Sequence, residues 1–560
     1  MMKLYLTLFF CIILSYPLCA QWGTTPAENL ILSEEQGVKL NKLALAGPDG
    51  SWYICYTNLV VNTQSLHLAR VDEVGQIIWA KTIKAGDEPG SLSAVMISDS
   101  LGGVILAWTD RRIENTAFTY ANRIDSDGNK LWGEEDMRIG ISEIEESCIK
   151  MVPDGQHGAW ITVYDDNPPQ GDFRGIYAYR IYANGTVPSR TYLFPGSNNC
   201  EDYAIARDGQ SGLLATTKYL HPLEAENQIR AMRIDSIGAK IWPDEAFDIG
   251  PISQPIGMKI QGSTRSYTYP SVRLHPGIGP YILYFENPGI NYPNEEIKHR
   301  GHLLSLDGTH EWPTEGIALN RPSINSPDIQ TLVDHEENLY FNYHTDSAFK
   351  LQKVTPEGTL PWGMDGIPYT TAFQGAPDNL LLTTCNDIII GIDGGPDEII
   401  EAIRINSMGQ MVYVPDASIP LSINTTEVQD RDPITAINAD DQVIALWNRD
   451  EDIGDAHMDV YVQGFGKDGV LGGIVNSTRN FIVQSISAYP NPAQNSIQLQ
   501  FGAEAIGITI TIKDIHGRTI FSRSIEEPNY QLDISLWPSG IYLLTGQSSR
   551  LIYTGKIFKQ

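Results

Sequence analysis

The sequence RIDSDGNKLW, residues 123–132, recurs in varied form along the chain. Its common features are an Arg five positions before a Gly and a Trp four positions after that Gly. The related stretches are RVDEVGQIIW (70–79), RIYANGTVPS (180–189), RIDSIGAKIW (233–242), LLSLDGTHEW (303–312), KVTPEGTLPW (353–362), RINSMGQMVY (404–413) and GFGKDGVLGG (464–473). Neighbouring glycines of these stretches lie 50 to 70 residues apart. Self-similarity at such a period is typical of repeat architectures.

Each stretch has the chemistry of a β-hairpin. Asp, Asn and Ser favour turn positions, and Gly supplies the positive φ that a tight connection needs. Two more short apolar runs precede each hairpin, as in residues 93–98 and 102–109. Each unit therefore contains about four short strands, and no convincing amphipathic helix separates them. Because a strand such as 104–108 is apolar on both faces, it needs cover on both sides, which sheets stacked around a ring provide. The pattern predicts an all-β fold with a β-propeller.

The two ends of the repeat region predict how the ring closes. Trp22-Gly23 resembles the start of a fourth strand that lacks the three strands before it, whereas the last unit has Gly472-Gly473 in place of Trp. We therefore expect residues 22–32 to complete the final unit and to remove two exposed sheet edges. Eight stretches predict eight blades. Seven blades is the alternative, because the 70-residue gap before Gly308 indicates an irregular fifth unit.

Composition and charge restrict the classes of function. Hydrophobic residues make up 42% and charged residues 19% of the chain, as in an ordinary globular protein. A formal charge of −29 disfavours binding to nucleic acid, since phosphate backbones would be repelled. Such a charge either keeps a secreted protein soluble or attracts calcium or a basic partner.

The N-terminus has the layout of a secretory signal peptide. Residues 1–20 contain one cation, Lys3, then an apolar run, and they end in Leu-Cys-Ala, which predicts cleavage between Ala20 and Gln21. The apolar run is shorter than the roughly 20 residues that a membrane span needs. A lipoprotein signal at Cys19 is the alternative, but Leu18 is large for it. No later segment is apolar enough to span a bilayer, so we expect no transmembrane segment in the mature chain.

Four cysteines remain after such cleavage: Cys55, Cys148, Cys200 and Cys385. Their number and spacing fit neither a disulfide framework nor a zinc site. Since Cys148 and Cys200 open equivalent strands of successive units, they are the candidate disulfide pair. Buried free thiols are the alternative.

The C-terminal residues carry a distinct set of motifs. Strands that alternate in polarity predict a small Ig-like β-sandwich over residues 486–560, after a linker at 474–485 and a repeat domain at 21–473. This region resembles the type A C-terminal sorting domain of the type IX secretion system (Por secretion system) of Bacteroidetes-type bacteria. The resemblance implies recognition by that machinery and export across both membranes, to the cell surface or the medium. The motif residues are Tyr489, Pro490, Asn491, Pro492, Gly517, Gly540, Tyr542 and Lys556.

Three sequences resemble metal or catalytic motifs. Asp125, Asp127 and Asn129 suggest a calcium loop, but the Gly and Glu that an EF-hand needs are missing, so a turn explains them better. Residues 305–312 approximate the Asp-box of sialidases, which is a hairpin feature. His299 and His302 fall on a strand and point to opposite faces, which indicates surface histidines rather than a metal pair. We expect no cofactor, with calcium as the one alternative.

The sequence favours a non-catalytic protein. We expect binding, adhesion or scaffolding at the cell surface, with a glycan or a protein as ligand, because no nucleophile elbow, phosphate loop or zinc-protease motif is present. The alternative is a carbohydrate-active hydrolase or lyase that uses one propeller face. In such an enzyme the polar residues after the second strand of each unit would converge. These residues are Asp110, Arg111, Asp165, Glu286, Asp346, Arg449 and Asp450.

Overall fold

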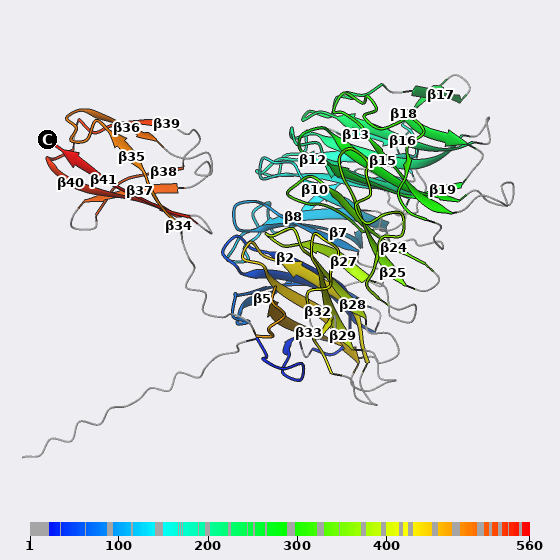
Figure 1. The fold of residues 1–560 in the computed structure, drawn as a ribbon, viewed down its shortest axis with the longest axis horizontal. Helices are drawn as coiled ribbons and strands as arrows, with labels where there is room; N and C mark the ends of the chain where they lie inside the picture. The colour runs from blue at the N-terminus through cyan, green and yellow to red at the C-terminus, as the bar shows by residue number, and fades with distance from the viewer. Residues whose placement is uncertain are drawn as a thin grey trace, which may run out of the picture. The chain divides into compact units, whose positions relative to one another are not determined.

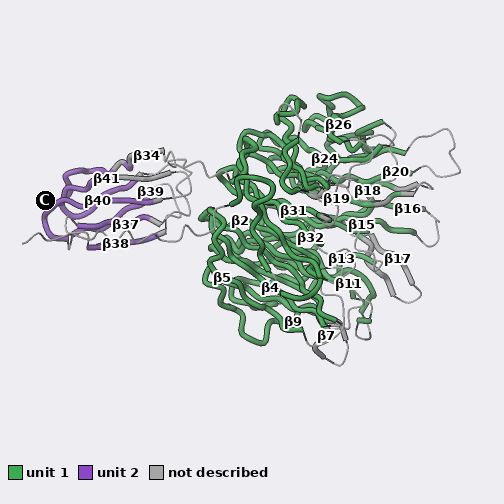
Figure 2. Tube along the Cα trace, turned by 90° about the horizontal axis from the view of Figure 1, so that it is seen from below, with its two compact units in different colours: residues 1–473 green, residues 474–560 purple. Residues whose placement is uncertain are grey.

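The chain divides into two compact units, residues 1–473 and 474–560, in a computed structural model (Figure 2). The structure describes residues 22–560 except 34, 62, 87–92, 114–115, 141–148, 166, 169, 171, 189, 196–201, 222–225, 244, 250–251, 264–265, 288–296, 322–329, 346–347, 371–376, 394–398, 414–417, 424–428, 451–456, 473–481, 501–508, 515–517, 525–528, 536 and 548–550. The predicted signal peptide, with Ala20 and Gln21, lies outside the described residues. Within them there is no α-helix, and hence no helix that could span a membrane.

The described part of the first unit forms eight antiparallel sheets (Figure 1). The first four are β2 (Val38–Ala46), β3 (Trp52–Val60), β4 (Thr63–Val71) and β5 (Ile77–Lys84); β6 (Ala94–Ser98), β7 (Val104–Ile113), β8 (Thr116–Ile124) and β9 (Met137–Ile139); β10 (Lys150–Pro153), β11 (Ala159–Asp165), β12 (Gly175–Ile181) and β13 (Arg190–Phe194); and β14 (Tyr203–Arg207), β15 (Leu213–His221), β16 (Glu226–Ile234), β18 (Ile252–Ser263) and β17 (Glu245–Ile249). The other four are β19 (Ser266–Leu274), β20 (Pro280–Asn287), β21 (Lys298–Leu303) and β22 (Ile317–Ala318); β23 (Thr331–Val333), β24 (Leu339–His344), β25 (Phe349–Val354) and β26 (Ile367–Pro368); β27 (Pro377–Leu382), β28 (Ile388–Asp393), β29 (Ile400–Ile405) and β30 (Ser418–Pro420); and β31 (Gln429–Ile437), β32 (Gln442–Asp450), β33 (Asp459–Gly466) and β1 (Leu30–Ser33).

The sheets stack face to face around a ring. In β7, Val104, Leu106 and Trp108 pack with the first sheet, whereas Ile105 and Ala107 pack with the third. Both faces of a strand are thus buried by neighbouring sheets, as the apolar runs predict. The first strand of each sheet contacts the first strands of the two adjacent sheets, in the order β2, β6, β10, β14, β19, β23, β27, β31 and back to β2. This closed cycle of radial sheets is a β-propeller.

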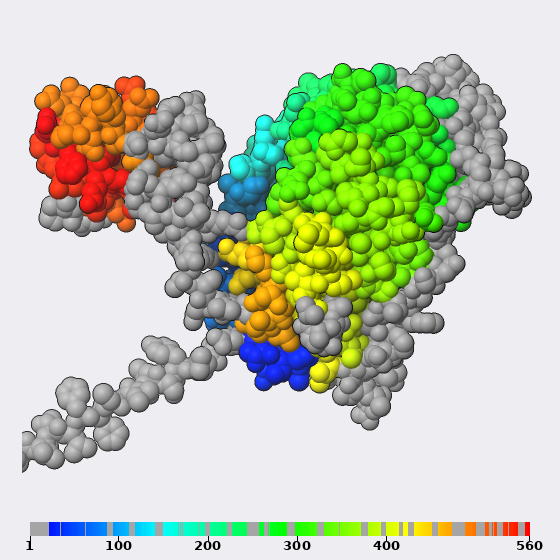
Figure 3. Space-filling model, viewed as in Figure 1, coloured from blue at the N-terminus to red at the C-terminus, as the bar shows by residue number. Residues whose placement is uncertain are grey.

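The N-terminal segment completes the last sheet, as predicted. β1 pairs antiparallel with β33, as the outermost strand of that sheet. In the space-filling view the first described residues, in blue, lie against residues of the last sheet, in yellow and orange (Figure 3). Trp22 is buried, and its indole Nε1 donates a hydrogen bond of 2.9 Å to the Glu73 carbonyl of the first sheet.

The recurring Arg and Trp side chains join several of the sheets to the next one. Arg70 and Trp79 both donate to the Ser126 carbonyl in the hairpin of the second sheet, at 2.8 and 2.9 Å. Arg123 and Trp132 donate likewise to Ala183, at 3.1 and 3.0 Å. In every such pair, and for Trp22, the acceptor lies two residues before the hairpin glycine. The sequence repeat is therefore a repeat of contacts between sheets.

The hairpin glycine is required by this packing. Gly75 has a φ of 88°, and a Cβ there would lie 2.9 Å from the Trp22 ring. Gly185 has a φ of 86°, and a Cβ there would lie 2.9 Å from the Trp132 ring. Glycine adopts this left-handed backbone without strain, and because it has no Cβ it leaves room for the Trp ring that comes from the preceding sheet.

The irregularity that we expected in the fifth unit lies partly in the fourth. The fourth sheet has five strands, because β17 forms a hairpin with β18 and adds an outer strand. The insertion falls between Gly238 and β19, so it lengthens the gap before Gly308 without changing the first three strands of the fifth sheet.

The second unit contains two sheets over its described residues. The larger has the order β34 (Ile482–Ser485), β41 (Leu551–Lys559), β40 (Gly540–Gln547), β37 (Thr509–Asp514) and β38 (Thr519–Ser524), and the smaller has β35 (Ser487–Tyr489), β36 (Ser496–Gln500) and β39 (Asn529–Asp533). Ile497 and Leu532 of the smaller sheet share one core with Ile512, Leu544 and Ile557 of the larger. The alternating polarity of the strands thus buries one face of each sheet.

Candidate functional site

The polar residues expected to converge lie in different sheets, and they make contacts within their own sheet. The Asp165 carboxylate of β11 lies 3.4 Å from the Arg190 guanidinium of β13. Glu286 of β20 accepts a hydrogen bond of 2.9 Å from Arg300 of β21. Asp110 accepts one of 3.0 Å from the Trp108 indole. The Arg111 side chain and Asp346 lie outside the described residues.

The last sheet shows the same pairing. Arg449 donates from Nε and Nη2 to the two carboxylate oxygens of Asp430, at 2.7 and 2.8 Å, and lies over the Tyr461 ring. Burial alone would disfavour the charged guanidinium, but the hydrogen bonds and charge of Asp430 outweigh it and raise the pKa of Arg449. Asp450 lies 3.9 Å from Arg431. These groups are held as ion pairs, not as a pair of carboxylates facing a substrate.

The residues of the suspected calcium loop form a turn. Asp125 Oδ1 accepts the backbone N–H groups of Asp127 and Asn129, at 2.9 and 2.8 Å. Hydrogen bonds of this kind are typical of a turn, so the Asp125 carboxylate stabilises the hairpin turn. The described residues contain no group of three or more His, Cys, Asp and Glu side chains that could hold a metal ion.

The expectation that His299 and His302 lie on the surface is wrong. They do point to opposite faces of β21, but neighbouring sheets cover both faces, so both side chains are fully buried. His299 packs against Phe341 of the sixth sheet, and His302 lies 3.0 Å from the Tyr284 hydroxyl. Desolvation by burial lowers the pKa of each to about 3.

The four cysteines divide into two groups. Cys148 and Cys200, the candidate disulfide pair, lie outside the described residues. Cys55 is a buried free thiol, and Cys385 is an exposed free thiol. Burial raises the pKa of Cys55, so this thiol stays protonated and unreactive.

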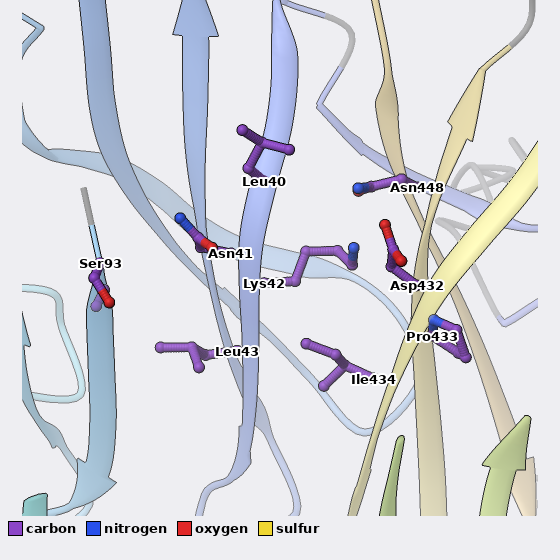
Figure 4. A pocket seen from close by; sticks show the side chains of 10 residues that line it. Leu40, Asn41, Lys42, Leu43, Ser93, Asp432, Pro433, Ile434 and Asn448 are labelled. Carbon is purple, nitrogen blue, oxygen red and sulfur yellow. The ribbon is translucent and has the colours of Figure 1, made fainter. Parts of the chain in front are cut away.

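A cavity opens between the first and last sheets, where the ring closes (Figure 4). Its volume of about 520 Å³ lies within the roughly 300–1,000 Å³ range of small-molecule sites. It is lined by Leu40, Asn41, Lys42 and Leu43 of β2, Ser93 and Ala94 at the start of the second sheet, Asp432, Pro433 and Ile434 of β31, and Asn448 of β32. We call this cavity the seam cavity.

Two matching β-bulges shape the seam cavity. The register of β2 shifts between Leu40 and Leu43, and that of β31 shifts between Arg431 and Ile434. Within the bulges Asn41 has a φ of 46° and Asp432 a φ of 54°. A bulge re-aims a side chain, and left-handed residues other than Gly are concentrated at functional sites.

The walls of the seam cavity carry both signs of charge. The Lys42 side chain extends from β2 toward Asp432 and Asn448 on the opposite wall (Figure 4). Lys42 is 4% exposed and Asn448 only 2%, whereas Asp432 is exposed. Asn448 Oδ1 is buried and accepts no hydrogen bond from the described residues. The sequence did not predict this site, although a Pro inside a strand, as at Pro433, is a known sign of a bulge.

In the second unit, the motif residues hold the last strand. Asn491 donates from Nδ2 to the Lys556 carbonyl at 2.7 Å and accepts the Phe558 N–H at 2.8 Å. Tyr542 is buried, and its hydroxyl donates to the Pro538 carbonyl at 2.8 Å. The other motif residues are exposed at Tyr489, Pro490, Pro492, Gly540 and Lys556, while Gly517 lies outside the described residues.

Comparison with known proteins identifies the second unit. Residues 487–560 match the family described as "Secretion system C-terminal sorting domain". No curated protein matches the chain.

Several solved structures resemble the chain weakly. The Pyrococcus horikoshii acylaminoacyl peptidase is 10% identical, with a TM-score of 0.36 over 74% of this chain and 58% of its own. Prolyl oligopeptidase B from Galerina marginata is 12% identical, with a TM-score of 0.39 over 74% and 56%. PorZ, a surface component of the type-IX secretion system of Porphyromonas gingivalis, is 10% identical, with a TM-score of 0.24 over 92% and 81%.

The match thus spans little more than half of either peptidase. Because all three TM-scores are below 0.5, no activity is transferred from these proteins to this chain. The C-terminal match is specific by contrast. Residues 487–560 are a C-terminal sorting domain of the type IX secretion system, and the chain is a β-propeller protein that this system exports to the cell surface or secretes.

Proposed function

We propose that this protein is an eight-bladed propeller that binds an extracellular ligand without transforming it. Eight sequence repeats, eight sheets among the described residues and one unbroken cycle of contacts between first strands support eight blades over seven. The core that the larger and the smaller sheet of the second unit share supports an Ig-like sandwich at the C-terminus.

The pairing of the polar residues at the ends of the second strands carries this proposal. Most glycoside hydrolases use a pair of carboxyl groups, one of which exchanges a proton with the substrate while the other attacks it or activates water. Asp165, Glu286 and Asp430 instead have Arg partners in their own sheets. Each carboxylate is thus paired with a cation inside its own sheet. The seam cavity, with its bulged walls, is the better place for a ligand.

The experiment uses the mature chain, residues 21–560. The protein is incubated with immobilised glycans and with a peptide library. Any ligand that binds is recovered, and its mass is measured by mass spectrometry. We expect the ligand to be recovered unchanged after prolonged incubation. Cleavage products that increase with protein concentration would contradict a non-catalytic role.

The export route adds two expectations to the proposal. The N-terminal layout supports removal of residues 1–20, so N-terminal sequencing of the exported protein should begin at Gln21. The motif set supports a type A sorting domain of Bacteroidetes-type. A mature protein that still begins at Met1 would argue against the signal peptide.

A further inference from the structure

We propose that the outer face of the larger sheet in the second unit docks on a membrane surface that carries anionic headgroups. The strands concerned are β37, β40 and β41, which lie side by side in that sheet (Figure 2). We call their outer side the docking face. The inference goes beyond the proposed function, because it concerns the sorting domain and does not depend on the ligand of the propeller.

The docking face carries an apolar patch. In β40, Tyr542 and Leu544 are buried in the core that the two sheets share, whereas Ile541 and Leu543 are each 43% exposed. Phe558 of β41 is 42% exposed and lies directly opposite Ile541 in the pairing register. Residues two apart on one strand, and residues opposite each other on neighbouring strands, lie on one face and close enough for their side chains to touch. These three side chains therefore form one continuous patch.

The outer face of the smaller sheet has the composition that is usual for a face in water. Gln498 and Gln531 lie opposite each other there, and both are exposed. Ser496 lies opposite Asp533 in the same pair of strands. Buried apolar residues that alternate with exposed polar ones are typical of an antiparallel sheet with one face in water. The larger sheet departs from this pattern at the patch, and an exposed apolar patch with a polar rim is typical of a contact surface.

Two lysines flank the patch. Lys513 of β37 and Lys556 of β41 lie opposite Leu543, one on each side, and both are exposed. No Asp or Glu is exposed among the described residues of β37, β40 and β41. The docking face therefore combines apolar side chains with positive charge. This combination is typical of protein surfaces that lie at the boundary between lipid headgroups and acyl chains.

The distribution of charge along the chain favours this unit for contact with an anionic membrane. Residues 474–560 contain seven Lys and Arg against five Asp and Glu, whereas residues 1–473 contain 32 against 63. Anionic headgroups repel a strongly acidic unit, and each Lys or Arg near them strengthens binding by about fivefold. The second unit is thus the part of the chain whose charge suits such a surface.

The same composition argues against a protein as the partner. Lysines are depleted from the cores of protein interfaces, because their ammonium groups would have to lose their water there. Two copies of the docking face would also bring Lys513 and Lys556 close to the same lysines of the other copy, and like charges repel. At a membrane surface the aliphatic stems of the lysines stay beside the apolar patch while their ammonium groups reach the phosphates. A lipid surface therefore accommodates both parts of the face.

The test is flotation of the mature chain, residues 21–560, with lipid vesicles at physiological ionic strength. Vesicles of phosphatidylcholine alone are compared with vesicles that contain equal parts of phosphatidylcholine and phosphatidylglycerol. The fraction of protein that floats with the lipid is measured as a function of lipid concentration. We expect binding to the mixed vesicles and at least about tenfold weaker binding to the neutral vesicles, since two lysines each contribute about fivefold.

Two double variants separate the apolar part of the docking face from the charged part. Ile541→Thr combined with Leu543→Thr keeps residues that favour strands and removes most of the patch, so it should abolish flotation with both kinds of vesicle. Lys513→Gln combined with Lys556→Gln should weaken binding to the mixed vesicles by about tenfold or more and leave binding to the neutral vesicles unchanged.

The matched control lies on the outer face of the smaller sheet. Gln498→Thr combined with Gln531→Thr should bind vesicles like the wild type. All six substituted positions are exposed, so each variant should fold, and circular dichroism with urea denaturation checks this.

Three outcomes would overturn the proposal. Equal flotation of the wild type and the Ile541→Thr, Leu543→Thr variant would show that the docking face is not the site of contact. Absence of wild-type flotation with the mixed vesicles would exclude the membrane as its partner. Absence of flotation together with loss of surface delivery of the Ile541→Thr, Leu543→Thr variant in cells would assign the face to a protein of the export machinery instead.

Discussion

His299 and His302 have no access to water in the folded propeller, and this gives the protein an acid sensitivity. Desolvation by burial lowers the pKa of each to about 3, from an ordinary value near 6.5. Between these values the unfolded chain binds protons that the folded chain cannot bind. The stabilising contribution of the neutral rings is thus complete above pH 6.5 and falls as the pH drops toward 3.

Urea denaturation at several pH values measures this effect. We expect the free energy of unfolding to decrease steadily from pH 7 to pH 4. In His299→Phe, which keeps an aromatic ring against Phe341 and removes one titrating group, the decrease should be smaller. His157→Asn, at an exposed position, serves as the control and should match the wild type. A slope unaltered in His299→Phe would contradict this account.

At the scale of the element, Gly464 in β33 makes room for Trp22. A Cβ at this position would lie 2.6 Å from the Trp22 ring, closer than real atoms approach. We expect Gly464→Ala to lower the free energy of unfolding by about 1–3 kcal/mol, as overpacking does. At Gly277 the nearest atom would lie 3.4 Å from the new Cβ, so Gly277→Ala should have little effect.

A double variant tests the contact itself. In a Trp22→Phe background the smaller ring leaves more space, so Gly464→Ala should cost less than it does in the wild type. The midpoint of urea denaturation, measured for all four combinations, gives the coupling. Additive effects would show that the clash with Trp22 is not the cause.

For the whole molecule, Trp22 closes the ring. We expect Trp22→Ala to lower the free energy of unfolding by about 3–5 kcal/mol, through loss of buried area and of the hydrogen bond to Glu73. Trp242→Ala is a matched control, because Trp242 is 3% exposed against 4% for Trp22 and also donates from Nε1 to the next sheet.

The two variants should differ in limited proteolysis. Only Trp22→Ala loosens a chain end, so only this variant should be cut near β1 under conditions in which the rest of the propeller resists. If both variants are cut at β1 to the same extent, Trp22 has no special part in closure.

Export depends on the second unit. Deletion of residues 486–560 should leave a folded propeller inside the outer membrane, because the sorting domain is the part that the type IX system recognises. Fractionation of cells, with a folding probe such as circular dichroism on the retained protein, measures this. Normal surface delivery of the truncated chain would refute the assignment, and an Asp127→Asn full-length chain is the control for expression.

The repeat, its strands and the closing segment were predictable because their causes are local or periodic. Gly at positive φ, Asp and Asn in turns, and a Trp at a fixed distance each leave a mark at the same place in every unit. The extra strand β17 and the buried state of His299 and His302 were not predictable in this way. Both depend on what lies beside a sheet, and the alternation of one strand does not reveal its neighbours.

The amino-acid sequence alone was enough to predict an all-β ring followed by an export domain. This is because turn residues and short motifs depend on neighbours only a few positions away in the sequence. The seam cavity depended on folding, because Asn41 and Asp432 are almost 400 positions apart in the sequence and meet only when the first and last sheets come together. The pairing of Asp165, Glu286 and Arg449 with oppositely charged side chains also depended on folding, which brings neighbouring strands of one sheet together. A charged side chain becomes a reactive group or one half of an ion pair according to the partner that packing places beside it.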